Sequence, residues 1–230
     1  MTGQSNFVSR VRRGLGRRLR RVGETLAPPS GDAGQRYEYQ LHLNQRGRLE
    51  GKVAIVTGGG GSIGSAVCYR LAIEGATVAV AGRTLDTLEA TVAQVVQAGV
   101  DADHVFPLVL DVTDEASVRS GIEAVVRAHS RIDILVNNAG ASARARVALL
   151  ENQSMSVVED VIDLNLLGAI RCARYVAIHL RQTAGRIVNF GSVVGLAGQE
   201  RFTDYAAAKG GISALTKSLA LELAPDGDRK

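Results

Sequence analysis

Residues 53–64 read Val-Ala-Ile-Val-Thr-Gly-Gly-Gly-Gly-Ser-Ile-Gly. The uncharged run at 53–57 is typical of a fully buried strand, and an apolar-periodic helix begins after the glycines, near Ser62. A strand, a glycine loop and a helix N-terminus in this order form a cradle for the pyrophosphate of a dinucleotide. Glycines let the backbone approach the phosphate oxygens, and the free N–H groups of the helix bind their negative charge. This stretch therefore predicts a dinucleotide-binding fold.

The four consecutive glycines fit two spacings at once. Gly59, Gly61 and Gly64 give G-x-G-x-x-G, whereas Thr57 and Gly58 with Gly61 and Gly64 give T-G-x-x-G-x-x-G. A flexible turn is the plain alternative, but a strand before and a helix after the loop favour the phosphate cradle. The lysine of a G-K-[ST] loop is missing, which argues against a nucleoside triphosphatase.

The rest of the chain from Val53 alternates between strand and helix patterns. We expect strands at 53–57, 77–81, 104–110, 133–136 and 186–190, and helices at 62–74, 85–98, 114–129, 155–182 and 204–223. Uncharged strands between amphipathic helices predict a doubly wound parallel sheet of the Rossmann type, an α/β fold over residues 51–230. Ser156 and Glu159 predict a capping box at the start of the long helix.

The segment before this domain has a different character. Residues 1–29 hold seven arginines and a single acid, Glu24, so they carry more than the whole net charge of +4. Apolar residues recur every three or four positions over residues 7–26, which is the pattern of a basic amphipathic helix. Three interpretations stay open: a disordered or partly helical extension, peripheral attachment to anionic lipid, and an organelle transit peptide. Residues 30–50 resemble a linker.

Composition limits the partners. Aromatic residues make up only 4% of the chain and Trp is absent, which argues against stacking on nucleic acid. Cys68 and Cys172 both fall in expected helices, which indicates buried thiols in a reducing, cytoplasmic compartment. The four histidines show no metal-ligand spacing, so we expect no metal.

The end of the second strand indicates which nucleotide binds. In this fold an acid about 20 residues after the last glycine accepts the ribose 2′-hydroxyl of NAD. Here Gly82 ends the strand and Arg83 and Thr84 follow, without a carboxylate. A guanidinium forms charge-assisted bonds to a 2′-phosphate, so the sequence favours NADP over NAD. A solvated loop arginine is the alternative.

Several further motifs resemble the short-chain dehydrogenase/reductase family, and together they cover residues 51–224 in the family's order. They are Asp111 after the third strand, the N-N-A-G run Asn137-Asn138-Ala139-Gly140, Asn165 in the long helix, Ser192 thirteen residues before Tyr205, and the Y-x-x-x-K motif Tyr205 to Lys209. The resemblance implies that Asp111 meets the adenine, that N-N-A-G borders the cofactor, and that Ser192, Tyr205, Lys209 and Asn165 are catalytic.

The chemistry of these residue types agrees with that assignment. Tyr205 and Lys209 are four residues apart, so they share one helix face. A phenol ordinarily loses its proton near pH ~10, and a nearby ammonium lowers that pKa. Tyr205 would then give a proton to a carbonyl oxygen, or take one in reverse, while the Ser192 hydroxyl orients the carbonyl. Lys209 can also reach ribose hydroxyls, and the resemblance implies that Asn165 holds a relay water.

We therefore predict an NADP(H)-dependent oxidoreductase that interconverts a carbonyl and a secondary alcohol, of the single-domain, 3-oxoacyl-reductase-like type. The candidate cofactor-binding residues are Thr57, Gly58, Gly61, Ser62, Ile63, Gly64, Arg83, Thr84, Asp111, Val112, Asn138, Ala139, Gly140, Tyr205 and Lys209. Two alternatives stay open: a sugar-nucleotide epimerase or dehydratase of the extended branch, and a cofactor-binding but catalytically incomplete protein.

Two features depart from the family pattern. Ser62 stands where the single-domain branch usually has Gly or Ala, and the chain stops at Lys230, soon after the Tyr205 helix. Family members continue into a sixth strand, a substrate-covering loop and helix, and a seventh strand. We therefore expect a truncated sheet, an unpaired edge at 186–190, and little or no reductase activity from residues 1–230 alone. For a longer product, the resemblance implies a homodimer or homotetramer built on the 155–182 and Tyr205 helices.

Overall fold

The computed structural model describes residues 47–142 and 146–224. Five parallel strands form one sheet in the order β3-β2-β1-β4-β5. They are β1 (Val53–Thr57), β2 (Thr77–Gly82), β3 (Val105–Val109), β4 (Ile134–Asn137) and β5 (Arg186–Asn189). The doubly wound parallel sheet expected from the sequence is confirmed.

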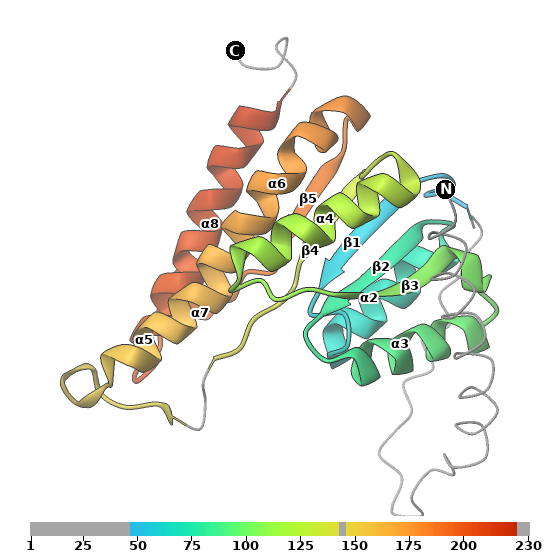
Figure 1. Ribbon diagram of the computed structural model, residues 1–230. Coiled ribbons are helices and arrows are strands. Elements are labelled where there is room, and N and C mark those ends of the chain that lie inside the picture. Colours follow the sequence, from blue (N-terminus) through green and yellow to red (C-terminus); the bar gives the residue numbers. More distant parts are fainter. Residues whose placement is uncertain (1–46, 143–145, 225–230) are drawn as a thin grey trace, which may run out of the picture. The chain divides into compact units, whose positions relative to one another are not determined.

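Helices cover both faces of the sheet. On one side lie α2 (Ser62–Ile73) and α3 (Leu85–Gln97), and on the other α4 (Glu115–His129) and α6 (Gly168–Thr183), as Figure 1 shows. The last helix, α8 (Thr203–Leu223), packs beside α6 and against the short α7 (Val194–Ala197). Because β1 is flanked by β2 and β4, the connections diverge there, and ligands bind in the crevice beyond such a switch point.

The long helix expected at 155–182 contains an irregular turn. It consists of α5 (Met155–Ile162), a π-helical segment (Asp163–Leu167) and α6. The capping-box prediction is wrong: Ser154 is the N-cap residue and its side chain makes no capping hydrogen bond, while Ser156 lies inside the helix. The hydroxyls of these two serines lie 2.8 Å apart and hydrogen-bond to each other instead.

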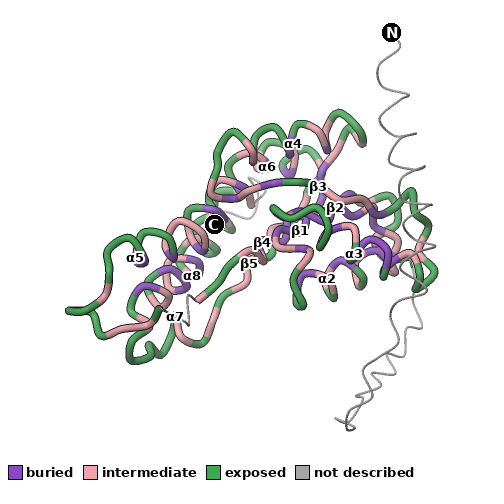
Figure 2. The backbone as a smooth tube through the Cα atoms, turned by 60° about the horizontal axis from the view of Figure 1, so that its bottom comes forward, coloured by how far each residue is buried: buried purple, intermediate pink, exposed green. Residues whose placement is uncertain are grey.

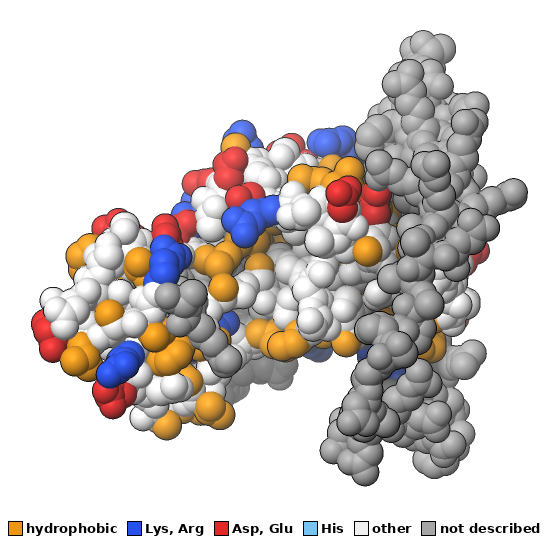
Figure 3. Space-filling model, turned by 90° about the horizontal axis from the view of Figure 1, so that it is seen from below, with side chains coloured by type: hydrophobic (Ala, Val, Ile, Leu, Met, Phe, Trp, Pro, Cys, Tyr) orange, Lys and Arg blue, Asp and Glu red, His pale blue; other side chains and the backbone are white. Residues whose placement is uncertain are grey.

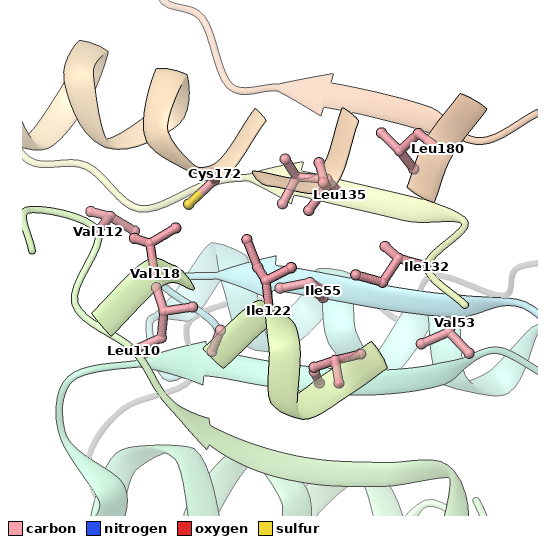
Figure 4. Close-up of a cluster of buried hydrophobic side chains, with 14 residues drawn as sticks. Val53, Ile55, Leu110, Val112, Val118, Ile122, Ile132, Leu135, Cys172 and Leu180 are labelled. Carbon is pink, nitrogen blue, oxygen red and sulfur yellow. The ribbon is translucent and has the colours of Figure 1, made fainter. Parts of the chain in front are cut away.

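One cluster of buried apolar side chains lies between the sheet and the α4–α6 layer. All five residues of β1 and the central four of β2 are buried (Figure 2). In Figure 4, Val118 and Ile122 of α4 and Cys172 of α6 lie over Ile55 and Leu135 of the sheet. Each fully buried aliphatic side chain of this kind stabilises the fold by about 1.5–3 kcal/mol, so the layers are fixed mainly by apolar burial.

Two buried carboxylates organise the opposite end of the sheet from the glycine loop. Asp133 accepts hydrogen bonds from the backbone N–H of Val53 at 3.0 Å and from Arg131 at 2.6 and 2.8 Å. Glu74 pairs with Arg48 and Arg70. Because Arg48 takes part, the packed domain already includes residues 47–50, which the sequence suggested as the end of a linker.

Within the described ranges β5 pairs only with β4, so it forms the open sheet edge that the sequence led us to expect. On the face shown in Figure 3, Lys and Arg side chains lie among Asp and Glu rather than in one basic stripe. None of the described helices combines the length and the apolar character needed to span a membrane. The predictions for residues 1–46 fall outside the described residues.

Candidate active site

The glycine loop and the start of α2 form a narrow backbone cradle. Helix α2 begins directly after Gly61, which as N-cap has no side chain to occupy the free N–H groups of the first turn. Gly58 has φ +66°, a conformation that glycine adopts without strain, and a Cβ on Gly64 would overlap the carbonyl oxygen of Gly58. The cradle therefore fits a phosphate group, which would bind to the exposed N–H groups.

A cavity of about 490 Å³ extends from this cradle along the carboxyl ends of the strands. Its walls consist of Gly58, Gly61, Ser62, Ile63, Gly64, Gly82, Arg83, Leu110, Asp111, Val112, Asn138, Ala139, Gly140, Ala141 and Leu164. The structure thus brings most of the candidate cofactor residues together. Sequence reasoning missed four lining residues: Gly82, Leu110, Ala141 and Leu164. Gly82 ends β2, Leu110 follows β3 and Ala141 follows the N-N-A-G run, and ligands bind at such strand ends in parallel sheets.

Thr57 does not line this cavity but supports it from below. Its hydroxyl accepts hydrogen bonds from the backbone N–H groups of Asn138 at 3.1 Å and Ala139 at 3.0 Å. The Asn138 side chain donates in return to the carbonyls of Thr57 and Gly58, at 2.9 and 3.2 Å. These bonds join the ends of β1 and β4 and fix the floor of the crevice. Thr84 also lies outside the lining, as the N-cap residue of α3.

Arg83 and Asp111 form the charged end of the cavity. Burial alone would raise the pKa of Asp111, but it accepts hydrogen bonds from Thr113 N at 2.9 Å and Thr113 Oγ1 at 2.8 Å. Together with the positive charges of Arg83 and Arg171, these bonds hold the pKa of Asp111 below its ordinary value. The carboxylate therefore stays ionised and acts as a hydrogen-bond acceptor, beside a guanidinium that suits an anion.

Lys209 is buried in the first half of α8, one turn after Tyr205. Its ammonium donates a 2.7 Å hydrogen bond to the carbonyl of Phe190 and lies 5.7 Å from the centre of the Tyr205 ring. Burial lowers the pKa of Lys209. A positive charge next to the phenol ring is the arrangement that the Y-x-x-x-K spacing led us to expect.

The π-helical segment directs Asn165 toward the same place. The Asn165 amide donates to the carbonyls of Ala141 at 2.8 Å and Val161 at 2.9 Å, while its Oδ1 is buried without a partner in the described part of the chain. A Cβ on Gly140 would lie 2.5 Å from this Oδ1 and 3.5 Å from Lys209 Nζ. The missing side chain of Gly140 thus lets Asn165 and Lys209 approach one point, where a donor could pair with the buried oxygen.

The loop after β5 carries Ser192 and leads into α7, which packs on the Tyr205 helix. The Ser192 hydroxyl accepts a hydrogen bond from the N–H of Val194 at 3.2 Å, which orients the first turn of α7. A Cβ on Gly195 would lie only 2.5 Å from the backbone carbon of Lys209. Because Gly195 has no side chain, α7 sits directly on α8 next to Lys209.

A second cavity, of about 120 Å³, adjoins the start of α8. Apolar and polar residues together form its lining, which consists of Ala148, Leu150, Gln153, Val158, Ile162, Arg201, Thr203, Asp204 and Ala207. Asp204, next to Tyr205, is buried and accepts a 3.4 Å hydrogen bond from Gln153. Sequence reasoning did not identify this cavity, because its walls come from segments about 50 residues apart. The described residues contain no group of His, Cys, Asp and Glu that could hold a metal ion.

The chain matches one protein family over most of its length. The model of the short chain dehydrogenase family matches residues 52–228. The chain is 40% identical over 178 residues to the 3-oxoacyl-[acyl-carrier-protein] reductase FabG of Thermotoga maritima, a match that covers 77% of this chain and 70% of that protein. It is 40% identical to the 2-dehydro-3-deoxy-L-rhamnonate dehydrogenase (NAD(+)) of a Sphingomonas species, covering 79% and 70%.

Similar proteins differ in length and in cofactor. The short-chain reductase protein NovJ of Streptomyces niveus is 42% identical, and the chain spans only 64% of its length. Among solved structures, NAD+-bound xylitol dehydrogenase is 36% identical with a TM-score of 0.72, covering 77% of this chain and 67% of the other. A short chain dehydrogenase from Mycobacterium smegmatis is 33% identical with a TM-score of 0.72, covering 78% and 74%.

Proposed function

Because the chain belongs to the short-chain dehydrogenase family, a family of oxidoreductases, we propose that it reduces a carbonyl to a secondary alcohol with NADPH, or catalyses the reverse oxidation. The observation that carries this proposal is the approach of Asn165 Oδ1 and Lys209 Nζ to the space above Gly140, with Tyr205 alongside. Gly140 itself lines the large cavity that begins at the glycine cradle. Gly140 therefore borders both the cavity and the space that Asn165 and Lys209 approach, which supports the proposal.

The residues of the chain would divide the chemistry as follows. NADPH supplies a hydride when it is bound. Tyr205 donates the proton that the carbonyl oxygen needs, and the neighbouring Lys209 ammonium stabilises the phenolate that remains. Ser192 donates a hydrogen bond to the same carbonyl oxygen and orients it. Asn165 holds a water beside Lys209, through which the proton is replaced.

Arg83 supports NADP over NAD as the cofactor. It lines the cavity at the end of β2, where Gly82 offers no carboxylate for a ribose 2′-hydroxyl. Its guanidinium would instead pair with a 2′-phosphate. Two of the similar proteins are named for NAD+, so this preference is a property proposed from the residues of this chain.

We also propose that copies of the chain associate through α6 and α8. Ile178 on α6 and Leu221 on α8 are exposed apolar side chains on these helices, and a second copy would cover them. Sedimentation of the wild type should give at least a dimer, and an Ile178→Glu variant should shift the equilibrium toward the monomer. A monomeric wild type would contradict this part of the proposal.

The activity is tested by NADPH oxidation with simple ketones and acetoacetyl esters. Enzyme in excess over NADPH makes even slow turnover measurable. We expect Tyr205→Phe to lower the rate by at least about 10²-fold, while NADPH still binds, because the positioned proton donor is lost. Tyr69→Phe on the outer side of α2 is the matched control and should keep the wild-type rate. Tight NADPH binding without oxidation by any carbonyl would instead indicate a catalytically incomplete protein.

A further inference from the structure

We propose that Arg171 is a positioning residue. It holds the π-helical turn 163–167 in the register that directs Asn165 into the candidate active site, and it ties this turn to Val112 in the loop after β3. The inference rests on the proposed function, because Asn165 matters only if the site handles protons. Arg171 itself lies on α6, outside the cavity lining, and the sequence motifs do not include it.

The guanidinium of Arg171 bridges two parts of the site. One nitrogen, Nη2, donates to Asp163 Oδ1 at 2.6 Å, and the other, Nη1, donates to the backbone carbonyl of Val112 at 3.1 Å. The side chains of Arg171 and Asp163 are 23% and 32% exposed. A short charge-assisted bond between partly buried groups is stronger and less screened than an exposed ion pair. The bridge therefore acts as a fixed clamp.

The ion pair requires the π register. Asp163 is the first residue of the π segment, and the N–H of Gly168 bonds to its carbonyl, five residues back. A π turn takes up one residue more than an α-helical turn. Arg171 is eight residues after Asp163, but with one residue taken up by the π turn it has the angular position of the seventh. A seventh residue lies on the same helix face as the first. In an uninterrupted α-helix the two side chains would be rotated apart by roughly 80°.

The Val112 end of the clamp reaches the nucleotide cavity. Val112 lines that cavity, and α6 lies so close to it that a Cβ on Gly168 would be 2.8 Å from Val112 Cγ2. The positive charge of Arg171 also helps to keep the neighbouring Asp111 ionised. One side chain thereby joins the loop after β3 to the turn that carries Asn165.

The position of Asn165 depends on the same turn. Its amide bonds to the carbonyls of Ala141 and Val161 and leaves Oδ1 facing the space between Gly140 and Lys209. If the turn relaxed to an α-helical register, the backbone from Asn165 onward would rotate by about 100° relative to α5. Asn165 could not then keep both bonds, so loss of the clamp should disorder this amide first.

The test uses the full chain and NMR of the Asn165 side-chain amide, assigned by its absence in Asn165→Leu. We expect Arg171→Gln to shift or broaden this signal, Arg171→Lys to preserve it in part, and Asp163→Asn to reproduce the change from the other partner. The double variant should show no more change than Arg171→Gln alone, because Asp163→Asn removes an interaction that Arg171→Gln already lacks. Arg174→Gln is the matched control: Arg174 lies one turn later on α6, pairs with the exposed Glu115 at 3.4 Å and lies over the Tyr175 ring, away from Asp163 and Val112.

Kinetics provides an independent measurement. In Arg171→Gln we expect single-turnover NADPH oxidation to fall about tenfold with an altered pH profile, a larger change than any rise in the Kd for NADPH caused by the lost bond to Val112. An unchanged Asn165 signal in both Arg171→Gln and Asp163→Asn would overturn the positioning role. Failure of the wild type to bind any nicotinamide nucleotide would instead reject the proposed function, and the Asn165 signal would still decide the role of Arg171.

Discussion

The Nζ atom of Lys209 lies 2.7 Å from the carbonyl oxygen of Phe190, the residue that follows β5. The N–H of Phe190 in turn donates to the carbonyl of Asn137 at the end of β4. The backbone of one residue, Phe190, therefore links the N-N-A-G segment to the helix that carries Tyr205. This linkage fixes where the buried ammonium sits before any ligand arrives, and it makes Lys209 the first residue whose replacement should reveal the chemistry.

Lys209→Met should lower NADPH oxidation by about 10²-fold or more, because the phenolate of Tyr205 loses its stabilising charge. Steady NADPH oxidation with a reactive ketone measures the effect, and circular dichroism checks the fold. Lys217→Met, on an exposed position two turns later in α8, should leave the rate unchanged. Equal rates for the two variants would remove Lys209 from the mechanism.

The rate of carbonyl reduction should fall on the alkaline side at a pH below the ordinary lysine pKa of ~10.4. Burial lowers the pKa of Lys209, so its ammonium loses its proton, and with it the charge that stabilises the phenolate, earlier than a free lysine would. A pH–rate profile of the wild type and of Lys209→Arg measures this. The arginine variant keeps its charge, so its alkaline limb should lie at higher pH. Coincident profiles would contradict the prediction.

Asp133→Asn should make the free energy of unfolding less dependent on pH in the acid range. Burial alone would raise the pKa of Asp133, but hydrogen bonds from Arg131, Val53 N and Lys52 lower it below the ordinary value. A carboxylate whose pKa is lower in the folded state than in the unfolded state stabilises the fold at any pH above its unfolded-state pKa of ~3.9. This stabilisation is lost as the pH falls through the folded-state pKa. At pH 7 the variant should be less stable by about 2 kcal/mol.

Urea unfolding between neutral and acid pH measures this difference. Glu123→Gln on α4 is the control, because its pair with Arg127 is exposed and 3.6 Å long and should contribute less than about 0.5 kcal/mol. If Asp133→Asn lost stability on acidification as steeply as the wild type, the buried cluster would not be the cause of the acid sensitivity.

The regular elements could be predicted because their signals are local. The uncharged run at 53–57 predicted β1 with the bounds observed, and Gly61 followed by Ser62 predicted the start of α2. The large cavity followed from the same signals, since residues at the ends of parallel strands converge on one crevice. Local pattern and tertiary structure agree at these positions.

The features that the sequence did not predict leave no trace in the apolar pattern. A π turn adds one residue without breaking the apolar pattern, so 155–182 looked like one regular helix although Asp163–Leu167 departs from it. Helix capping depends on where the chain enters the helix, and here the entry residue is Ser154 rather than Ser156. The pair of Arg48 with Glu74 joins residues 26 apart, which no periodicity reveals.

Gly64→Ala should destabilise the domain by about 1–3 kcal/mol, because the new Cβ would overlap the backbone carbonyl of Gly58 and the loop would have to move. Gly61→Ala is the matched control in the same loop. Its φ is −86° and its Cβ would lie 3.4 Å from Gly58 O, an ordinary contact. Thermal unfolding without nucleotide compares the two; equal melting temperatures would show that the loop is not close-packed.

Arg83→Leu should weaken NADPH binding about 10- to 100-fold and leave NADH binding nearly unchanged. The lost interaction is a charge-assisted bond to the 2′-phosphate, worth about 1.5–3 kcal/mol, and NADH lacks that phosphate. Titration of nucleotide fluorescence with both cofactors measures the ratio, so NADH serves as the control within the same variant. A general distortion of the cavity that Arg83 lines would weaken the binding of both cofactors equally. That equal loss would contradict the role of Arg83 in selecting NADP, whereas a selective loss would locate the selectivity at the end of β2.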